Sequence, residues 1–318
     1  MNDIEVFEPF DASFSNLGKI SVSQGEAFEM HICELALIAD CLSKKASGLL
    51  DEGINIYEVF AMISESVSFD APGFAEDTLP ENRDAIGYFM SNVSLLDKAM
   101  LSKLLIDKLR DSGRAVSESD FLESLHPQET FTYVKNALAD EAYDVFSQDF
   151  SDPRLSYAQS FKDACRMVAE GDVGYCILPF EERGGIRIPG IASIIASFDL
   201  KIVSVTPVFG FEGNADVKYA LFSRTFKISE HKPEDDRYLE ILTSFDESLT
   251  VAKLLCVAEL FGISVYRINT IDTVIDGEET TSFSIVLRDD GNDFTPFLAF
   301  LALFAEEYTP VGFYTNLE

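Results

Sequence analysis

The sequence contains no tryptophan, only three histidines, and only 24 basic residues against 55 acidic ones. The resulting formal charge of −31 argues against a nucleic-acid partner, because a protein that neutralises phosphates needs clustered lysine and arginine. An anionic membrane surface requires the same basic residues, so we expect no membrane partner either. In so acidic a chain, any arginines that gather near one another stand out.

Cysteine and histidine are also too scattered to predict a metal site or a disulfide framework. The five cysteines form no CxxC pair and the histidines include no HExxH motif, so we expect no metal and no cofactor. The first residues, MNDIEVFEPF, lack the pattern of a secretory signal, and the most apolar stretch, 294–305, is too short for a membrane span. These features predict a reduced, cytoplasmic protein.

The remaining composition is that of a folded chain, and its 318 residues predict two or three domains. Residues 1–115 have a mostly helical pattern, in which one apolar stripe begins near Glu81 and ends at Gly113. Residues 116–230 alternate short strands with helices and predict a single α/β lobe. Its helices are expected over 130–142, 160–170 and from Pro189, and its strands over 174–178 and 201–208.

Residues 237–318 have a second organisation. Strands are predicted over 238–245, 263–270, 282–287 and 311–314, and helices over 249–261 and 295–305. The order βαββαβ is the split βαβ, or ferredoxin-like, arrangement. The expected fold class is therefore multidomain, α/β and α+β, with a helical N-terminal region.

Four segments resemble motifs of the prephenate dehydratase family, whose members carry a C-terminal ACT regulatory domain. Leu125-His-Pro-Gln-Glu-Thr-Phe131 is similar to the family's Leu-Gly-Pro-x-Gly-Thr-Phe, and residues 171–182 to its Asp-Tyr-Gly-Val-x-Pro-Ile-Glu-Asn. Ser223-Arg224 resembles part of its Thr-Arg-Phe. Residues 261–268 resemble the strand that precedes its Glu-Ser-Arg-Pro. The resemblance implies a periplasmic-binding-protein-like lobe followed by an ACT-like domain.

The chain departs from the family at several positions. His126 and Glu129 replace the two glycines of the first motif, and Glu182-Arg183 stands where the family has Asn-Ser. Between Val205 and Ser223 there is one short connection where the family has a whole second lobe. A substrate cleft between two lobes is therefore not expected in this chain.

The resemblance also implies roles for individual residues. Prephenate is a dicarboxylate that loses carbon dioxide and its ring hydroxyl, so its site needs cations and a hydrogen-bond donor to the leaving oxygen. The implied residues are Ser223 and Arg224 for catalysis, Thr130, Glu181, Arg183 and Arg187 for substrate binding, and Asn269 and Thr270 for regulation. The alternative interpretation is that Arg183 and Arg187 pair with neighbouring carboxylates and that Ser223-Arg224 merely ends a strand.

Three functions remain open. The missing lobe and the lost Asn-Ser favour a catalytically degenerate, ligand-binding or regulatory relative in phenylalanine metabolism. The retained hydroxyl and arginine at Ser223-Arg224 would suit an active dehydratase, a carbon–oxygen lyase, and the acidic helical region would suit a protein-interaction module. The resemblance implies a small carboxylate ligand, either prephenate or an aromatic amino acid, and a homodimer.

Overall fold

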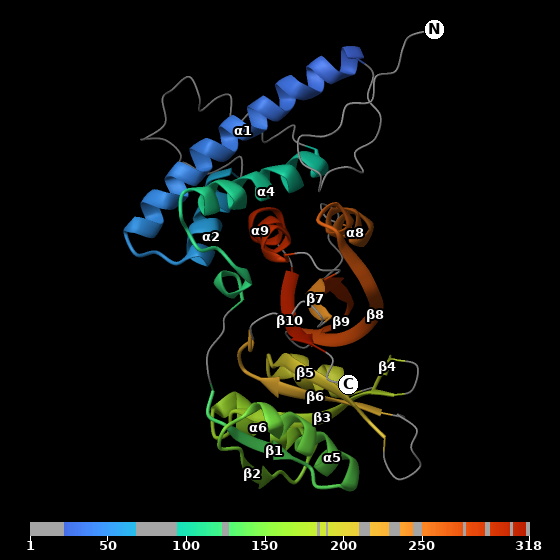
Figure 1. Cartoon of the computed structure of the whole chain (residues 1–318). Helices are drawn as coiled ribbons and strands as arrows, with labels where there is room; N and C mark the ends of the chain where they lie inside the picture. The colour runs from blue at the N-terminus through green and yellow to red at the C-terminus, as the bar shows by residue number, and fades with distance from the viewer. Residues whose placement is uncertain are drawn as a thin grey trace. The chain divides into compact units, whose positions relative to one another are not determined.

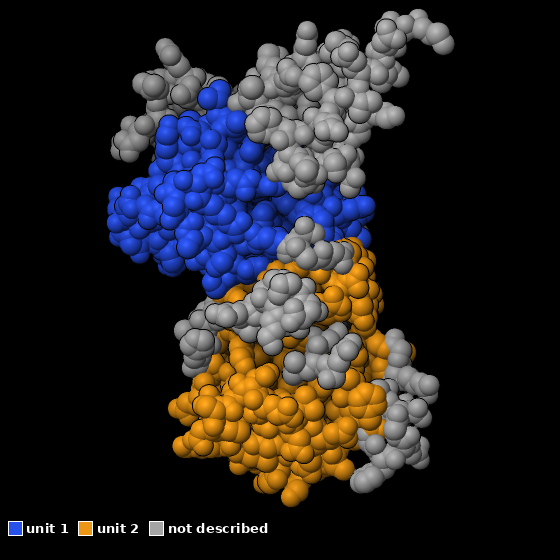
Figure 2. Space-filling model, viewed as in Figure 1, with its two compact units in different colours: residues 1–121, 247–263, 292–306 blue, residues 122–246, 264–291, 307–318 orange. Residues whose placement is uncertain are grey.

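The computed structural model describes residues 22–67, 94–122, 127–182, 185–188, 190–209, 217–228, 236–243, 250–275, 278–289, 293–305 and 308–315 (Figure 1). The chain divides into two compact units, each made of segments that are distant in sequence. The first comprises residues 1–121, 247–263 and 292–306, and the second residues 122–246, 264–291 and 307–318 (Figure 2). The division of the sequence into domains 1–115, 116–230 and 237–318 stays a prediction.

The first unit is helical. Its helices are α1 (Val22–Asp51), α2 (Ile56–Val67), α4 (Leu95–Asp111), the short η3 (Glu118–Asp120), α8 (Val251–Leu260) and α9 (Thr295–Phe304). Helix α9 is apolar on all sides and almost entirely buried, as expected of a helix at the centre of a bundle.

The single helix predicted from near Glu81 to Gly113 does not run unbroken, because α4 begins at Leu95. The Ser94 side chain accepts a bond from the Asp97 N–H, and the Asp97 carboxylate accepts one from the Ser94 N–H. This capping box fixes the first turn of α4 at Leu95. The earlier part of the predicted stripe lies outside the described residues.

The second unit contains the α/β lobe predicted from the sequence. Its strands are β1 (Thr130–Tyr133), β2 (Arg154–Tyr157), β3 (Tyr175–Glu182), β4 (Ile186–Arg187), β5 (Lys201–Val208) and β6 (Val217–Ser223). Its helices are α5 (Ala137–Phe146), the short η4 (Ser147–Asp149), α6 (Phe161–Glu170) and α7 (Ile191–Ser197). Strands β1, β2 and β3 run parallel, whereas β6 is antiparallel to both β3 and β5.

The helix predicted over 130–142 is wrong in its first half. Residues 130–133 are Thr-Phe-Thr-Tyr, which alternate β-branched and aromatic side chains and form strand β1. The helix begins only after Asn136, whose side-chain oxygen accepts a bond from the Ala139 N–H. The capping asparagine is therefore the boundary that the sequence interpretation overlooked.

The predicted order βαββαβ is confirmed over the last third of the chain. It consists of β7 (Arg237–Thr243), α8, β8 (Ile263–Ile275), β9 (Glu278–Asp289), α9 and β10 (Tyr308–Thr315). Its strands continue the sheet of the lobe, because Gly312 of β10 pairs in parallel with Ile202 of β5. The result is one ten-stranded mixed sheet in the order β2-β1-β3-β6-β5-β10-β7-β9-β8, with β4 paired to β3. The α/β fold class is confirmed.

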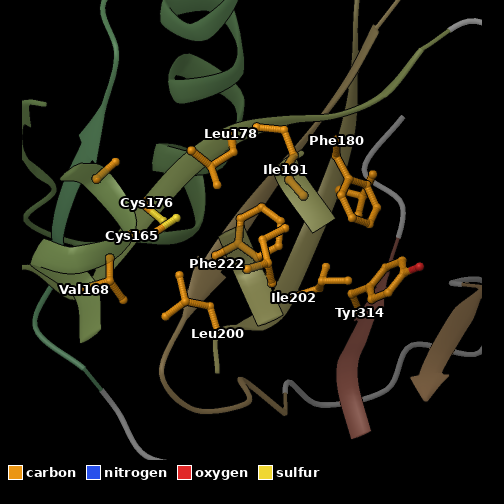
Figure 3. Packing of buried hydrophobic residues seen from close by; sticks show 14 of the residues in the cluster. Cys165, Val168, Cys176, Leu178, Phe180, Ile191, Leu200, Ile202, Phe222 and Tyr314 are labelled. Atoms are coloured by element: carbon orange, nitrogen blue, oxygen red, sulfur yellow. The ribbon is translucent and has the colours of Figure 1, made fainter. Parts of the chain in front are cut away.

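One apolar core spans both halves of this sheet (Figure 3). Cys165 and Val168 of α6 pack toward the lobe strands at Cys176, while Tyr238, Val286 and Tyr314 come from β7, β9 and β10. Each large side chain buried in this way contributes about 1.5–3 kcal/mol to folding. The two sets of strands therefore stabilise each other.

Candidate functional site

Three of the predicted site residues lie at one end of the sheet, where β1 and β3 begin and β6 ends. The Thr130 hydroxyl accepts a hydrogen bond of 2.8 Å from the Gly174 N–H. Ser223 is only 1% exposed, and its Oγ has no hydrogen-bond partner among the described residues. The exposed Arg224 places its guanidinium beside Gly171. This is the amino end of the parallel strands, whereas α/β sheets usually bind ligands at the carboxyl ends.

Glu181 and Arg187 lie at the opposite end. Cys176 of β3 pairs with Phe222, next to Ser223, and Glu181 follows Cys176 by five residues on β3. At about 3.3 Å per residue the separation is roughly 17 Å. The structure therefore does not bring Ser223 and Arg224 together with Glu181 and Arg187.

Arg187 is buried in a network that links the lobe to β7. Its Nη2 donates a 2.5 Å hydrogen bond to Glu240 Oε2, and its Nε lies 3.6 Å from Glu181 Oε1. The guanidinium stacks on the Phe180 ring at 3.5 Å from the centroid. Burial by itself lowers the pKa of Arg187, but the charge of Glu240, together with Tyr314 and Glu181, outweighs burial and raises it. Arg187 therefore remains a cation.

Glu240 receives two further bonds. The Ser284 hydroxyl donates to Glu240 Oε1 at 2.6 Å, and the Tyr314 hydroxyl donates to Oε2 at 3.2 Å. Burial, followed by the charge of Glu240, raises the pKa of Tyr314 well above its ordinary value, so that Tyr314 keeps its proton. With both oxygens engaged, the buried carboxylate of Glu240 has the partners that a buried charge requires.

Arg267 connects the far edge of the sheet to the same network. Its Nη1 donates to Glu181 Oε1 at 2.6 Å and to the Gly185 carbonyl at 2.8 Å. Arg267 lies on β8, six positions from β3 in the strand order. In a flat sheet with strands about 4.8 Å apart those two strands would be separated by roughly 29 Å. The sheet therefore coils enough for β8 to meet the β3–β4 hairpin.

A small pocket lies beside this network. It is lined by Phe180, Glu181, Val205, Lys218, Tyr238, Tyr266 and Tyr314. Its free volume of about 10 Å³ accommodates roughly one water molecule. The lining thus combines four aromatic rings with one carboxylate and one ammonium group.

Lys218 is the cation of the pocket. It is the cross-strand neighbour of Glu181, yet no carboxylate of the described residues lies within 4 Å of its ammonium group. Glu181 and Glu240 balance the charges of Arg187 and Arg267, so that the buried network is neutral. Among the described residues, Lys218 therefore supplies a positive charge that no carboxylate balances.

The other predicted residues lie elsewhere. Arg183 is outside the described residues. Asn269 and Thr270 lie on β8, where Asn269 is half-buried and Thr270 is exposed. The Asn269 Nδ2 is buried with no hydrogen-bond partner among the residues that are described.

Across the described ranges, no three His, Cys, Asp or Glu side chains converge in a way that could hold a metal ion. None of the helices in those ranges is long and apolar enough to cross a membrane.

No protein-family model matches the chain, and no curated protein matches it. Solved structures with a similar fold include a prephenate dehydratase from Streptococcus mutans, 15% identical over 59% of this chain and 99% of that chain, with a TM-score of 0.46. A prephenate dehydratase from Arthrobacter aurescens in complex with L-Phe is 12% identical over 58% and 89% of the two chains, with a TM-score of 0.41. The chain is distantly similar to prephenate dehydratases. A novel type of quorum-quenching acylase is 18% identical over 59% and 95%, with a TM-score of 0.44.

Four residues of the site were missed by sequence reasoning, namely Lys218, Glu240, Arg267 and Tyr314. The sequence could have revealed Glu240, because its carboxylate lies in the middle of the apolar strand Tyr-Leu-Glu-Ile-Leu. No comparable indication exists in the sequence for Lys218 or Arg267, since a basic residue on a strand usually faces solvent.

Proposed function

We propose that this chain is a catalytically inactive, ligand-binding relative of the prephenate dehydratases, and that its ligand is a small aromatic carboxylate such as an aromatic amino acid or prephenate. The observation that supports the proposal is the pocket beside Glu181 and Lys218. Its rings suit an aromatic side chain, and Lys218 suits a carboxylate.

The partners of the arginines support the absence of catalysis. Arg187 and Arg267 both donate to carboxylates of the protein itself, so that their positive charges are already balanced within the chain. Ser223, the implied hydrogen-bond donor, is buried at the other end of the sheet. A donor must lie within hydrogen-bond reach of the atom it serves, and these groups are far apart.

Other expectations belong to the same proposal. An ACT-like regulatory role for residues 237–318, with Asn269 and Thr270 taking part, would couple ligand binding to an output. The cytoplasmic location and the homodimer expected from the resemblance are further parts of it. The three-domain division is also retained as a proposal.

The test combines binding with turnover. Thermal unfolding is measured with L-phenylalanine, L-tyrosine or prephenate, and with two controls, phenethylamine, which lacks the carboxylate, and alanine, which lacks the ring. A ligand present at a hundredfold excess over its Kd should raise the melting temperature by about 5 °C or more, whereas the controls should not. Phenylpyruvate formation from prephenate is followed in parallel and is expected to be absent.

Two results would overturn the proposal. Phenylpyruvate formation that disappears in Ser223→Ala and Arg224→Ala would establish an active dehydratase. No shift with any aromatic carboxylate, in a folded protein, would favour the protein-interaction module instead.

A further inference from the structure

The pocket beside Lys218 is narrow. Its free volume of about 10 Å³ compares with roughly 300 Å³ or more for pockets that hold small organic ligands. A ligand with an aromatic ring can enter only if one wall of the pocket moves.

Among the strands that line the pocket, β8 is the one with a neighbouring strand on one side only. Phe180, Val205, Lys218, Tyr238 and Tyr314 lie on strands that have a neighbour on each side. Tyr266 lies instead on β8, which ends the strand order, and this residue is 43% exposed. An edge strand is hydrogen-bonded along one side only, and such elements open at low cost.

Arg267 follows Tyr266 in the sequence and attaches this edge strand to the β3–β4 hairpin. Its bonds to Glu181 and to the Gly185 carbonyl join β8 to both sides of the β3–β4 hairpin turn. Gly185 is adapted to this contact, because a Cβ at that position would lie 2.5 Å from Arg267 Nη2. Gly185 also has φ +79°, a conformation that other residues rarely adopt.

We infer that Arg267 is a clasp that keeps the pocket narrow by tying β8 to the β3–β4 hairpin, and that ligand entry requires its release. The inference rests on the proposed function for the identity of the site. It adds a mode of regulation, since any event that draws Arg267 away from Glu181 opens the pocket.

The first experiment needs no ligand. Lys218 is acetylated with trace acetic anhydride, and its labelling is measured by mass spectrometry relative to the exposed Lys162 of the same molecule. The variants are Arg267→Gln, which removes the charge, and Gly185→Ala, which displaces the guanidinium but keeps it. Arg154→Gln is the control, because Arg154 forms an exposed ion pair with Asp152 in the same unit.

Lys218 labelling should rise at least fivefold in Arg267→Gln and Gly185→Ala, and should stay at the parental value in Arg154→Gln. Circular dichroism establishes which variants are folded, and either clasp variant suffices for the comparison. Unchanged labelling of Lys218 in a folded clasp variant overturns the inference.

The second experiment separates the clasp from the proposed function. L-phenylalanine association is followed by stopped-flow tyrosine fluorescence, which the absence of tryptophan leaves unobscured. Association should be at least fivefold faster in Arg267→Gln than in the parent. Faster labelling with no binding of any aromatic carboxylate would support the clasp and reject the proposed function. Equal association rates with unchanged labelling would reject the clasp and leave the proposed function standing.

Discussion

Glu181 and Lys218 are cross-strand neighbours on β3 and β6, yet the Glu181 carboxylate is bonded to Arg267 of β8 instead. Opposite charges at such positions usually pair with each other. Because a distant arginine has taken the carboxylate, Lys218 is left at the pocket with its charge unbalanced by the described residues. This exchange of partners leaves Lys218 as the lining cation of the pocket that has no carboxylate partner among the described residues.

Replacing Lys218 should weaken binding of an aromatic carboxylate. Lys218→Met keeps the length of the side chain but loses a charge-assisted hydrogen bond, so Kd should increase roughly tenfold to a hundredfold. Lys218→Arg should retain most of the affinity. Isothermal titration with the ligand identified by thermal unfolding measures both. A Kd unchanged in Lys218→Met would place the carboxylate elsewhere.

Removing Glu240 should destabilise the second unit strongly. Glu240→Ala leaves the buried Arg187 without its closest carboxylate and costs about 3–5 kcal/mol in the free energy of unfolding. Urea unfolding measured by circular dichroism gives this value. The double variant Arg187→Met/Glu240→Leu removes both charges and should lose less stability than Glu240→Ala alone. A double variant at least as unstable as the single one would show that the ion pair is not the cause.

Ser223→Ala should leave the fold intact. Its Oγ is buried without a partner among the described residues, so its removal relieves an unsatisfied hydroxyl and should change stability by less than about 1 kcal/mol. Thr130→Ala is the comparison, because the Thr130 hydroxyl accepts the Gly174 N–H. It should cost more than Ser223→Ala in the same urea assay, and the reverse order would contradict the geometry.

Protonation of Asp293 should lower the free energy of unfolding of the first unit in acid. Burial by itself raises the pKa of Asp293, but the bonds from Thr295 and the Arg110 guanidinium outweigh it, so the folded pKa lies below the ordinary 3.8. Because the pKa of Asp293 is lower in the folded than in the unfolded state, its ionisation stabilises the folded state, and this contribution is fully present at pH values above the unfolded pKa. That stability is lost as the pH falls through the folded pKa.

Asp293→Asn tests this contribution. The variant should be less stable than the parent near pH 7, and the difference should shrink as the pH falls below the ordinary pKa of 3.8 and through the lowered pKa of the folded parent. Urea unfolding between pH 7 and pH 3 measures the difference. A difference that stays constant over this range would show that the charge of Asp293 is not responsible.

Two glycine substitutions should have opposite effects. A Cβ on Gly312 would lie 2.9 Å from Ile202 Cβ, where β10 joins β5, so Gly312→Ala should cost about 1–3 kcal/mol. Gly48 is exposed in α1 with open space around it, and Gly48→Ala should stabilise by about 0.5–1 kcal/mol. Thermal unfolding distinguishes the two signs. Destabilisation by Gly48→Ala would contradict the helix at that position.

The sequence by itself determined much of the secondary structure. Strand β5 has the predicted bounds, α6 begins one residue after the predicted start, and the order βαββαβ over the last third is correct. These features are local, because hydrophobic periodicity and capping residues specify an element through residues that are close together in the sequence. The first turn of α4 and strand β1 were misassigned where Ser94 and Asn136 interrupt a continuous apolar pattern.

The tertiary structure alone decided the site. Arg187 meets Glu240 across 53 positions of sequence and Arg267 meets Glu181 across 86, and no local pattern specifies either contact. Both depend on the joining of β10 to β5 and on the coiling of the sheet, which set the register between strands that are distant in sequence. The sequence therefore determined which charged residues were available, and the sheet decided which of them were neutralised and which, like Lys218, faced a pocket.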